Sequence, residues 1–314
     1  MKLSLISIGG YSKGMFSNRK SAPQVISTKV VGGIGNQLFC YFAGYSLARK
    51  FNYKLNIDVS DIRQGRSVHE VSIESFQLPG HFISINETYF SLYCKRIFKH
   101  LNRRFSLNLG LNSNYHSKVI GYDPNLEEIK GPTKLNGYFQ TFRYFERISR
   151  ELLPLKLKNE TEWFKTTLKV LQESDFVSIH IRRGDYEKLS QNYGLLSESY
   201  YRRAIEKIAA LSINGRFVIF SDDIDKAREV LSDLVSEETY WIDPPGNVSP
   251  AESLILMSYA SANIIANSTF SWWGAALNTK KSAVVAPSKW FRNMDDPQDL
   301  YPLDWHLIES SWEP

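Results

Sequence analysis

Short apolar runs alternate with amphipathic stretches through residues 176–286, and this alternation constrains the fold more than any other feature. The runs are short, β-branched and bounded by polar residues, which is typical of buried strands. Strands that alternate with helices of this length predict a parallel, doubly wound sheet. We expect strands over 176–181, 216–220, 239–242, 263–266 and 283–286, and helices near 197–211, 225–234, after Ser249–Pro250 and near 271–278.

The first half of the chain carries a weaker pattern. It predicts a strand over 29–31, a helix from about 36 to 51, a strand over 55–58, a basic helix over 84–108, loops over 110–135, a strand end at 136–140 and a helix near 141–145. A chain of 314 residues exceeds the size at which a single core usually stops growing. We therefore expect two domains, 1–155 and 156–314, with the boundary in the region 150–172.

Composition and charge narrow the class of protein. The formal net charge of +5 suits an acidic small substrate but is too small and dispersed to predict nucleic-acid binding. No run approaches the roughly 18 apolar residues that a membrane span needs. The two cysteines, Cys40 and Cys94, show no metal or disulfide spacing, and Cys40 is expected to be buried. These features favour a cytoplasmic protein, and the basic stretch 95–104 is interpreted as a solvated helix face or, alternatively, a peripheral membrane contact.

Two adjacent arginines follow the predicted strand 176–181. Arg182 and Arg183 place fixed positive charge at the carboxyl end of that strand, where open α/β sheets bind their ligands. Guanidinium groups hold phosphate oxygens through paired hydrogen bonds. We therefore predict an anion site, most simply for a diphosphate. The alternative is a surface arginine pair that forms a salt bridge with Asp185.

A glycine-rich turn precedes the first predicted helix. Glycines such as Gly33 and Gly35 let a backbone approach a ligand closely and direct helix-terminal N–H groups at an anion. Asn36 and Gln37 add amide donors that can reach phosphate or sugar hydroxyls. Leu38 stands where dinucleotide folds have a third glycine, which weakens a dehydrogenase interpretation. A tight turn with Asn36 as the N-cap is the equal alternative.

Polar residues also follow two later strands. Asp222 and Asp223 could bind ribose or a base, although helix capping is the favoured role of Asp223 over metal binding with Asp225. Hydroxyl and N–H groups at the start of the predicted helix 271–278 form a second phosphate cradle, while the neighbouring tryptophans Trp272 and Trp273 are expected in the core. The polar residues of that cradle are Asn267, Ser268, Thr269 and Ser271.

Together, the segments 33–39, 180–186, 220–223 and 264–276 resemble those of bacterial α-1,2-fucosyltransferases, over about residues 28–292. The resemblance implies a GT-B-like fold of two Rossmann-like domains, with the donor site in the cleft and mainly on the C-terminal domain. It also implies transfer of fucose from GDP-fucose to the 2-hydroxyl of a galactoside, without metal or other cofactor. By analogy, the acceptor is an O-antigen unit on a lipid carrier at the inner membrane. The alternatives are another GDP-sugar transferase, such as an α-1,6-fucosyltransferase, or a binding module without turnover.

Residue by residue, the resemblance implies that both domains contact the donor. Arg182 contacts the diphosphate, Arg183 supports it, and His180 lies near the nucleotide. Asp222 or Asp223 helps to place the nucleoside. The phosphates are held from two sides by Gly33, Gly35 and Asn36, and by Ser268, Thr269, Phe270 and Ser271.

The acceptor side is less defined by the sequence. Asp185 is a candidate catalytic base, and an equal alternative is that it orients Arg182 or Arg183. Acceptor choice is expected in loops of the first half, around 63–69 and 138–140.

Overall fold

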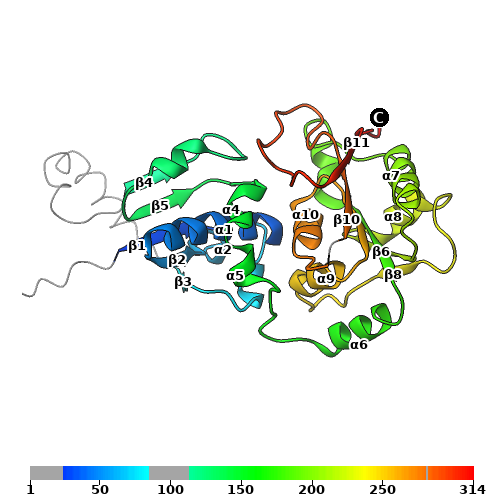
Figure 1. The fold of residues 1–314 in the computed structure, drawn as a ribbon, viewed down its shortest axis with the longest axis horizontal. Coiled ribbons are helices and arrows are strands. Elements are labelled where there is room, and N and C mark those ends of the chain that lie inside the picture. Colours follow the sequence, from blue (N-terminus) through cyan, green and yellow to red (C-terminus); the bar gives the residue numbers. More distant parts are fainter. Residues whose placement is uncertain (1–23, 85–112, 281) are drawn as a thin grey trace, which may run out of the picture.

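The computed structural model describes residues 24–84, 113–280 and 282–314. These residues form two lobes, each built on a sheet in which all strand pairings are parallel (Figure 1). This architecture confirms the predicted α/β class with two Rossmann-like, GT-B-like domains. The sheets lie on either side of the expected 155/156 boundary, which itself stays a prediction.

The first lobe has the strand order β3-β2-β1-β5-β4. Its strands are β1 Val25–Lys29, β2 Lys54–Asp58, β3 His81–Ile83, β4 Ser113–His116 and β5 Thr133–Asn136. Its helices are α1 Ile34–Phe51, α2 Ser60–Arg63, α4 Phe142–Glu146 and α5 Ser149–Leu152, with short 3-10 helices η1 Ser72–Ser75 and η2 Pro124–Glu128.

The second lobe has the strand order β11-β10-β9-β6-β7-β8. Its strands are β6 Phe176–Ile181, β7 Arg216–Ser221, β8 Tyr240–Ile242, β9 Ala262–Ile264, β10 Ala283–Pro287 and β11 His306–Ile308. Its helices are α7 Glu198–Ala210, α8 Ile224–Leu231, α9 Pro250–Met257 and α10 Thr269–Ala276, with α6 Glu162–Leu171 leading in from the first lobe and η3 Gly184–Leu189 after β6.

Prediction and structure differ most in the first lobe. The first strand lies at Val25–Lys29 rather than 29–31, and the expected loop region 110–135 contains β4 and η2. Asn36 is not an N-cap, because α1 already begins at Ile34 with Gly33 in that position. The predicted basic helix, the stretch 95–104 and Cys94 lie outside the described residues. In the described part of the chain, no helix has both the length and the apolar character to cross a membrane.

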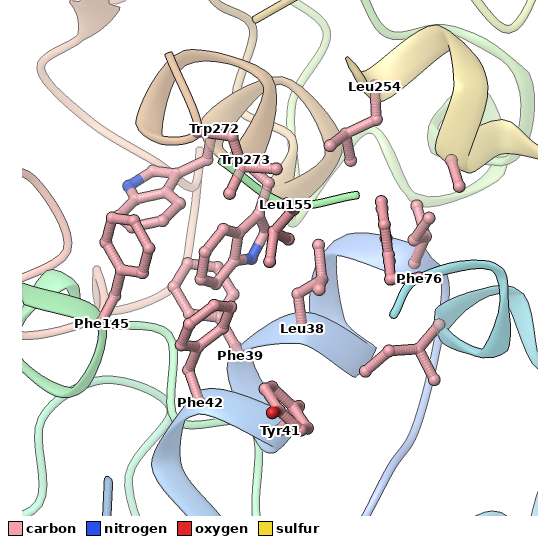
Figure 2. Close-up of a cluster of buried hydrophobic side chains, with 14 of the residues drawn as sticks. Leu38, Phe39, Tyr41, Phe42, Phe76, Phe145, Leu155, Leu254, Trp272 and Trp273 are labelled. Carbon is pink, nitrogen blue, oxygen red and sulfur yellow. The ribbon is translucent and has the colours of Figure 1, made fainter. Parts of the chain in front are cut away.

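One hydrophobic core runs across the junction of the two lobes. Phe39 and Phe42 of α1 pack on the two tryptophans of α10, with centroids 4.6 Å apart for Phe39–Trp272 and 4.7 Å apart for Phe42–Trp273 (Figure 2). Both tryptophans are fully buried, which confirms their predicted core role. Phe145 of α4 closes the cluster from the side. The starts of α1 and α10 are consequently held against each other.

Candidate active site

A cavity of about 690 Å³ lies between the lobes, within the range of about 300–1,000 Å³ typical of small-molecule sites. Both lobes line it, and eight of the sequence-predicted site residues lie on its wall. Those eight are Gly33, Gly35, Asn36, Arg182, Asp185, Ser268, Thr269 and Phe270.

The first wall of the cavity is the start of α1. Gly32 has a φ of +67°, which glycine adopts without strain, and the chain then enters the helix at Ile34. The N-cap Gly33 has no side chain to cap the helix, and the first turn carries no acidic residue. The side-chain oxygen of Asn36 accepts a hydrogen bond from Gln140 at 2.9 Å. The helix-terminal N–H groups are therefore available to an anion.

The second wall is the start of α10, directly beside the first. The N-cap Ser268 forms no side-chain capping hydrogen bond, and no acidic residue lies in the first turn. In contrast, Asp223, Thr161 and Ser249 cap their own helices α8, α6 and α9 through side-chain oxygens. The two helix starts that meet at the cavity are thus left without side-chain caps, and their partial positive charges add up there.

Gly35 allows this close approach. A Cβ atom at this position would lie 2.5 Å from the carbonyl oxygen of Thr269 and 2.6 Å from its hydroxyl. Any side chain would therefore meet the backbone of the opposite lobe. The glycine is required by the contact between α1 and α10, in addition to any contact with a ligand.

Arg182 supplies the formal positive charge of the cavity. Its guanidinium forms ion pairs with Asp185 and, at 3.0 Å, with Asp222, and it lies 5.0 Å from the ring centre of Tyr186. The side chain of Asp222 also accepts a hydrogen bond from the backbone N–H of Arg183 at 2.8 Å. Gly184 completes the turn with a φ of +37°, and a Cβ there would collide with Asp222. Asp222 therefore fixes both the backbone of the turn and the guanidinium.

Arg183 points away from the cavity. It is only 2% exposed, forms an ion pair with Glu313 at 2.7 Å and donates a hydrogen bond to the carbonyl of Leu196 at 3.1 Å. The backbone of Glu313 is itself anchored through its N–H to the carbonyl of Leu195. The second arginine thus ties the strand–turn segment to the C-terminal residues, a supporting position rather than a cavity-lining one.

His180 lies beneath the cavity wall. It is 3% exposed, and its ring packs on Phe270 with a centroid distance of 5.3 Å. Burial, helped by the nearby charge of Arg182, lowers the pKa of His180 to about 3. The imidazole is therefore neutral at ordinary pH. Its Nδ1 has no hydrogen-bond partner among the described residues.

Gln37 is buried and does not line the cavity. Its amide nitrogen donates to the carbonyls of Gly32 at 2.8 Å and Glu70 at 2.7 Å, and its oxygen accepts from the N–H of Ile73. The side chain therefore binds the glycine turn to the segment that follows α2.

Three further predicted residues do not line the cavity. The amide of Asn267 donates to the carbonyls of Tyr193, Gly194 and Trp290. Ser271 is fully buried and donates to backbone carbonyls within its own turn. Asp223 accepts from the N–H of Lys226 at 3.1 Å, which confirms its predicted capping role.

Sequence reasoning missed part of the cavity wall. Glu70 and Tyr193 line it, as do several exposed apolar side chains. Tyr138 and Val68 belong to the loops in which acceptor selection was expected. Leu189 ends the short helix η3 and Met294 lies in a loop, and neither had a signal in the sequence, because a single apolar side chain in so short a segment shows no periodicity.

The model of glycosyl transferase family 11 matches residues 25–309. An α-1,2-colitosyltransferase of Escherichia coli is 28% identical over 91% of this chain and 99% of its own length. The O-antigen biosynthesis glycosyltransferase WbnK of Escherichia coli is 30% identical over 83% of this chain and 93% of its own length. A galactoside 2-α-L-fucosyltransferase of Mus musculus, Sec1, is 24% identical over 55% of this chain and 50% of its own length. A structure of NodZ α-1,6-fucosyltransferase soaked with GDP-fucose superimposes with a TM-score of 0.48 at 13% identity, over 88% of this chain and 100% of NodZ. The extent of the family match shows that the chain is a member of glycosyl transferase family 11.

Proposed function

We propose that this glycosyltransferase moves L-fucose from GDP-β-L-fucose to the 2-hydroxyl of a terminal galactose, with inversion. The observation that carries the proposal is the meeting of Arg182 with two uncapped helix starts at one cavity. A guanidinium and converging N–H groups match the charge and the spread of a diphosphate. Family membership supports the α-1,2 linkage.

The same groups would drive the departure of GDP. Negative charge grows on the diphosphate as the bond to the sugar breaks, and preorganised donors stabilise that charge. Arg182 meets it from the second lobe, with Ser268 and Thr269 at the start of α10, while Gly33 and Gly35 approach from the first lobe. We expect no divalent cation to be needed, so that EDTA leaves the rate unchanged.

Asp185 and Asp222 have a supporting role in this scheme. Both carboxylates contact the guanidinium of Arg182, and Asp222 also holds the backbone of the turn. We infer that Asp185 keeps the guanidinium aimed into the cavity until the diphosphate arrives. Phe270 then offers a ring surface beside the neutral His180, near the nucleotide.

Colitose is the alternative to fucose as the transferred sugar. Colitose is fucose without the 3-hydroxyl, and one similar protein is named as a colitosyltransferase. The acceptor is proposed as a galactoside of an O-antigen unit on a lipid carrier, at the cytoplasmic face of the inner membrane. The similarity to an O-antigen glycosyltransferase supports this choice.

A transfer assay tests the proposal. The protein is incubated with GDP-fucose or GDP-colitose and a panel of β-galactosides, and GDP release and the linkage of the product are measured. We expect acceptor-dependent GDP release and an α-1,2-linked product. An α-1,6 linkage would favour the rival transferase, and binding of GDP without release from either donor would leave only a binding module.

A further inference from the structure

Among the residues that the structure describes, two with carboxylate side chains line the cavity, Asp185 on the second lobe and Glu70 on the first. The carboxylate of Asp185 is occupied by Arg182. The carboxylate of Glu70 forms no ion pair or hydrogen bond with any residue in the ranges 24–84, 113–280 and 282–314, and the residue is exposed and lines the cavity. An acid engaged by a guanidinium is a poor proton acceptor, so Glu70 is the cavity carboxylate that is free to act as one.

The backbone of Glu70 is nevertheless held firmly. Its carbonyl accepts hydrogen bonds from the buried amide of Gln37 at 2.7 Å and from the N–H of Ser72 at 3.0 Å. The same amide of Gln37 also donates to the carbonyl of Gly32, so the backbone that carries the Glu70 side chain is anchored to the first lobe. The adjacent ring of His69 lies 3.8 Å from the position that a Cβ of Gly33 would take.

We propose that Glu70 is the general base of the transfer reaction, an inference that rests on the proposed function. In a single inverting displacement the acceptor attacks from the face opposite the leaving group, so the base belongs on the far side of the sugar from the diphosphate. Arg182 belongs to the second lobe and Glu70 to the first. The carboxylate of Glu70 takes the proton of the acceptor 2-hydroxyl as its oxygen bonds to the anomeric carbon. The bond from that carbon to the β-phosphate oxygen breaks, and GDP leaves with the electron pair.

Kinetics of three substitutions test this role. Glu70→Gln keeps the shape of the side chain but cannot accept the proton, so kcat is expected to fall by about 10²–10⁴. The dissociation constant of GDP, measured by calorimetry, is expected to stay within about twofold of wild type. Glu70→Asp should retain part of the rate. Glu74→Gln is the matched control, because Glu74 lies four residues away, pairs with Arg63 at 2.6 Å and does not line the cavity.

Chemical rescue separates a base from a structural residue. Glu70→Ala is expected to regain acceptor-dependent transfer when formate is added, because formate can occupy the vacated space and take the proton. The proposal is overturned if Glu70→Gln turns over within threefold of wild type. It is equally overturned if GDP affinity falls in parallel with kcat and formate restores nothing. Wild-type protein that binds GDP but transfers neither fucose nor colitose would remove the proposed function first, and the base role with it.

Discussion

Replacement of Gly35 by alanine is expected to damage stability and activity together. The new Cβ would lie 2.5 Å from the carbonyl oxygen of Thr269, about 0.9 Å short of an ordinary contact of 3.4 Å. The Cβ is attached directly to the backbone of α1, and the carbonyl oxygen belongs to the backbone of α10, so no side-chain rotation relieves the clash. Overpacking of this kind costs about 1–3 kcal/mol, and the better helix propensity of alanine returns at most about 1 kcal/mol. With the full return, the net free energy of unfolding should therefore fall by up to about 2 kcal/mol.

The functional effect of Gly35→Ala should exceed the effect on stability. Relief of the clash moves the starts of α1 and α10 apart by an amount near 1 Å, and such a displacement of binding groups can cost about 10² in rate. Thermal unfolding, GDP calorimetry and the transfer assay measure the three quantities on one preparation. Gly246→Ala is the control, because a Cβ at Gly246 meets nothing within 4 Å. A Gly35→Ala protein that matches this control in GDP affinity and turnover would refute the argument.

Three further substitutions probe neighbouring parts of the site. Arg182→Lys keeps the charge but loses the planar fork, so kcat/KM should fall by about 10²–10³ in the transfer assay, and near-normal turnover would contradict the role. Glu313→Gln leaves Arg183 buried without its counter-charge, and urea unfolding should show that the free energy of unfolding falls by about 1–2 kcal/mol. This loss is smaller than for a fully buried ion pair, because the side chain of Glu313 is 35% exposed. Between pH 6.5 and 4.5 the unfolded chain binds a proton at His180 that the folded chain, with a pKa of about 3, does not. The free energy of unfolding should thus decrease as the pH is lowered, by up to about 1.4 kcal/mol per pH unit. An unchanged dependence of stability on pH in His180→Asn would contradict this.

The sequence predicted the second lobe more closely than the first. The strand 176–181 has the predicted ends, and the other four predicted strands of this lobe lie within two residues of their expected ends. Four of these strands have a neighbour on each side in the sheet, where continuous apolar runs are required, and only β8 lies at its edge. β1 carries the polar residues Ser27 and Thr28, and both are buried. The hydroxyl of Thr28 donates a hydrogen bond to the carbonyl of Cys40 in α1 of the same lobe. No local sequence pattern reveals this contact between β1 and α1.

The candidate site shows a different limit of sequence reasoning. Every motif contributes residues that line the cavity or that contact a residue lining it. They did not separate residues that line the cavity from residues that hold the wall in place. Arg182 and Arg183 are neighbours in the sequence, yet the first faces the cavity and the second pairs with Glu313. The side-chain amides of Gln37 and Asn267 likewise donate their hydrogen bonds to backbone carbonyls. A polar side chain in a motif is as useful for fixing a loop as for binding a ligand, and only the fold decides between the two.

The two helix starts that line the cavity and the core between the lobes are parts of the same two helices, α1 and α10. The first turns of α1 and α10 line the cavity, and the next turns bury Phe39 and Phe42 against Trp272 and Trp273. The positions of the free N–H groups are therefore set by aromatic packing that no ligand touches. A close-packed interior passes small displacements on instead of absorbing them. Burial of these aromatic side chains can thus preorganise the two helix starts. This explains how residues more than 200 positions apart in the chain can be held with the accuracy that charge stabilisation requires.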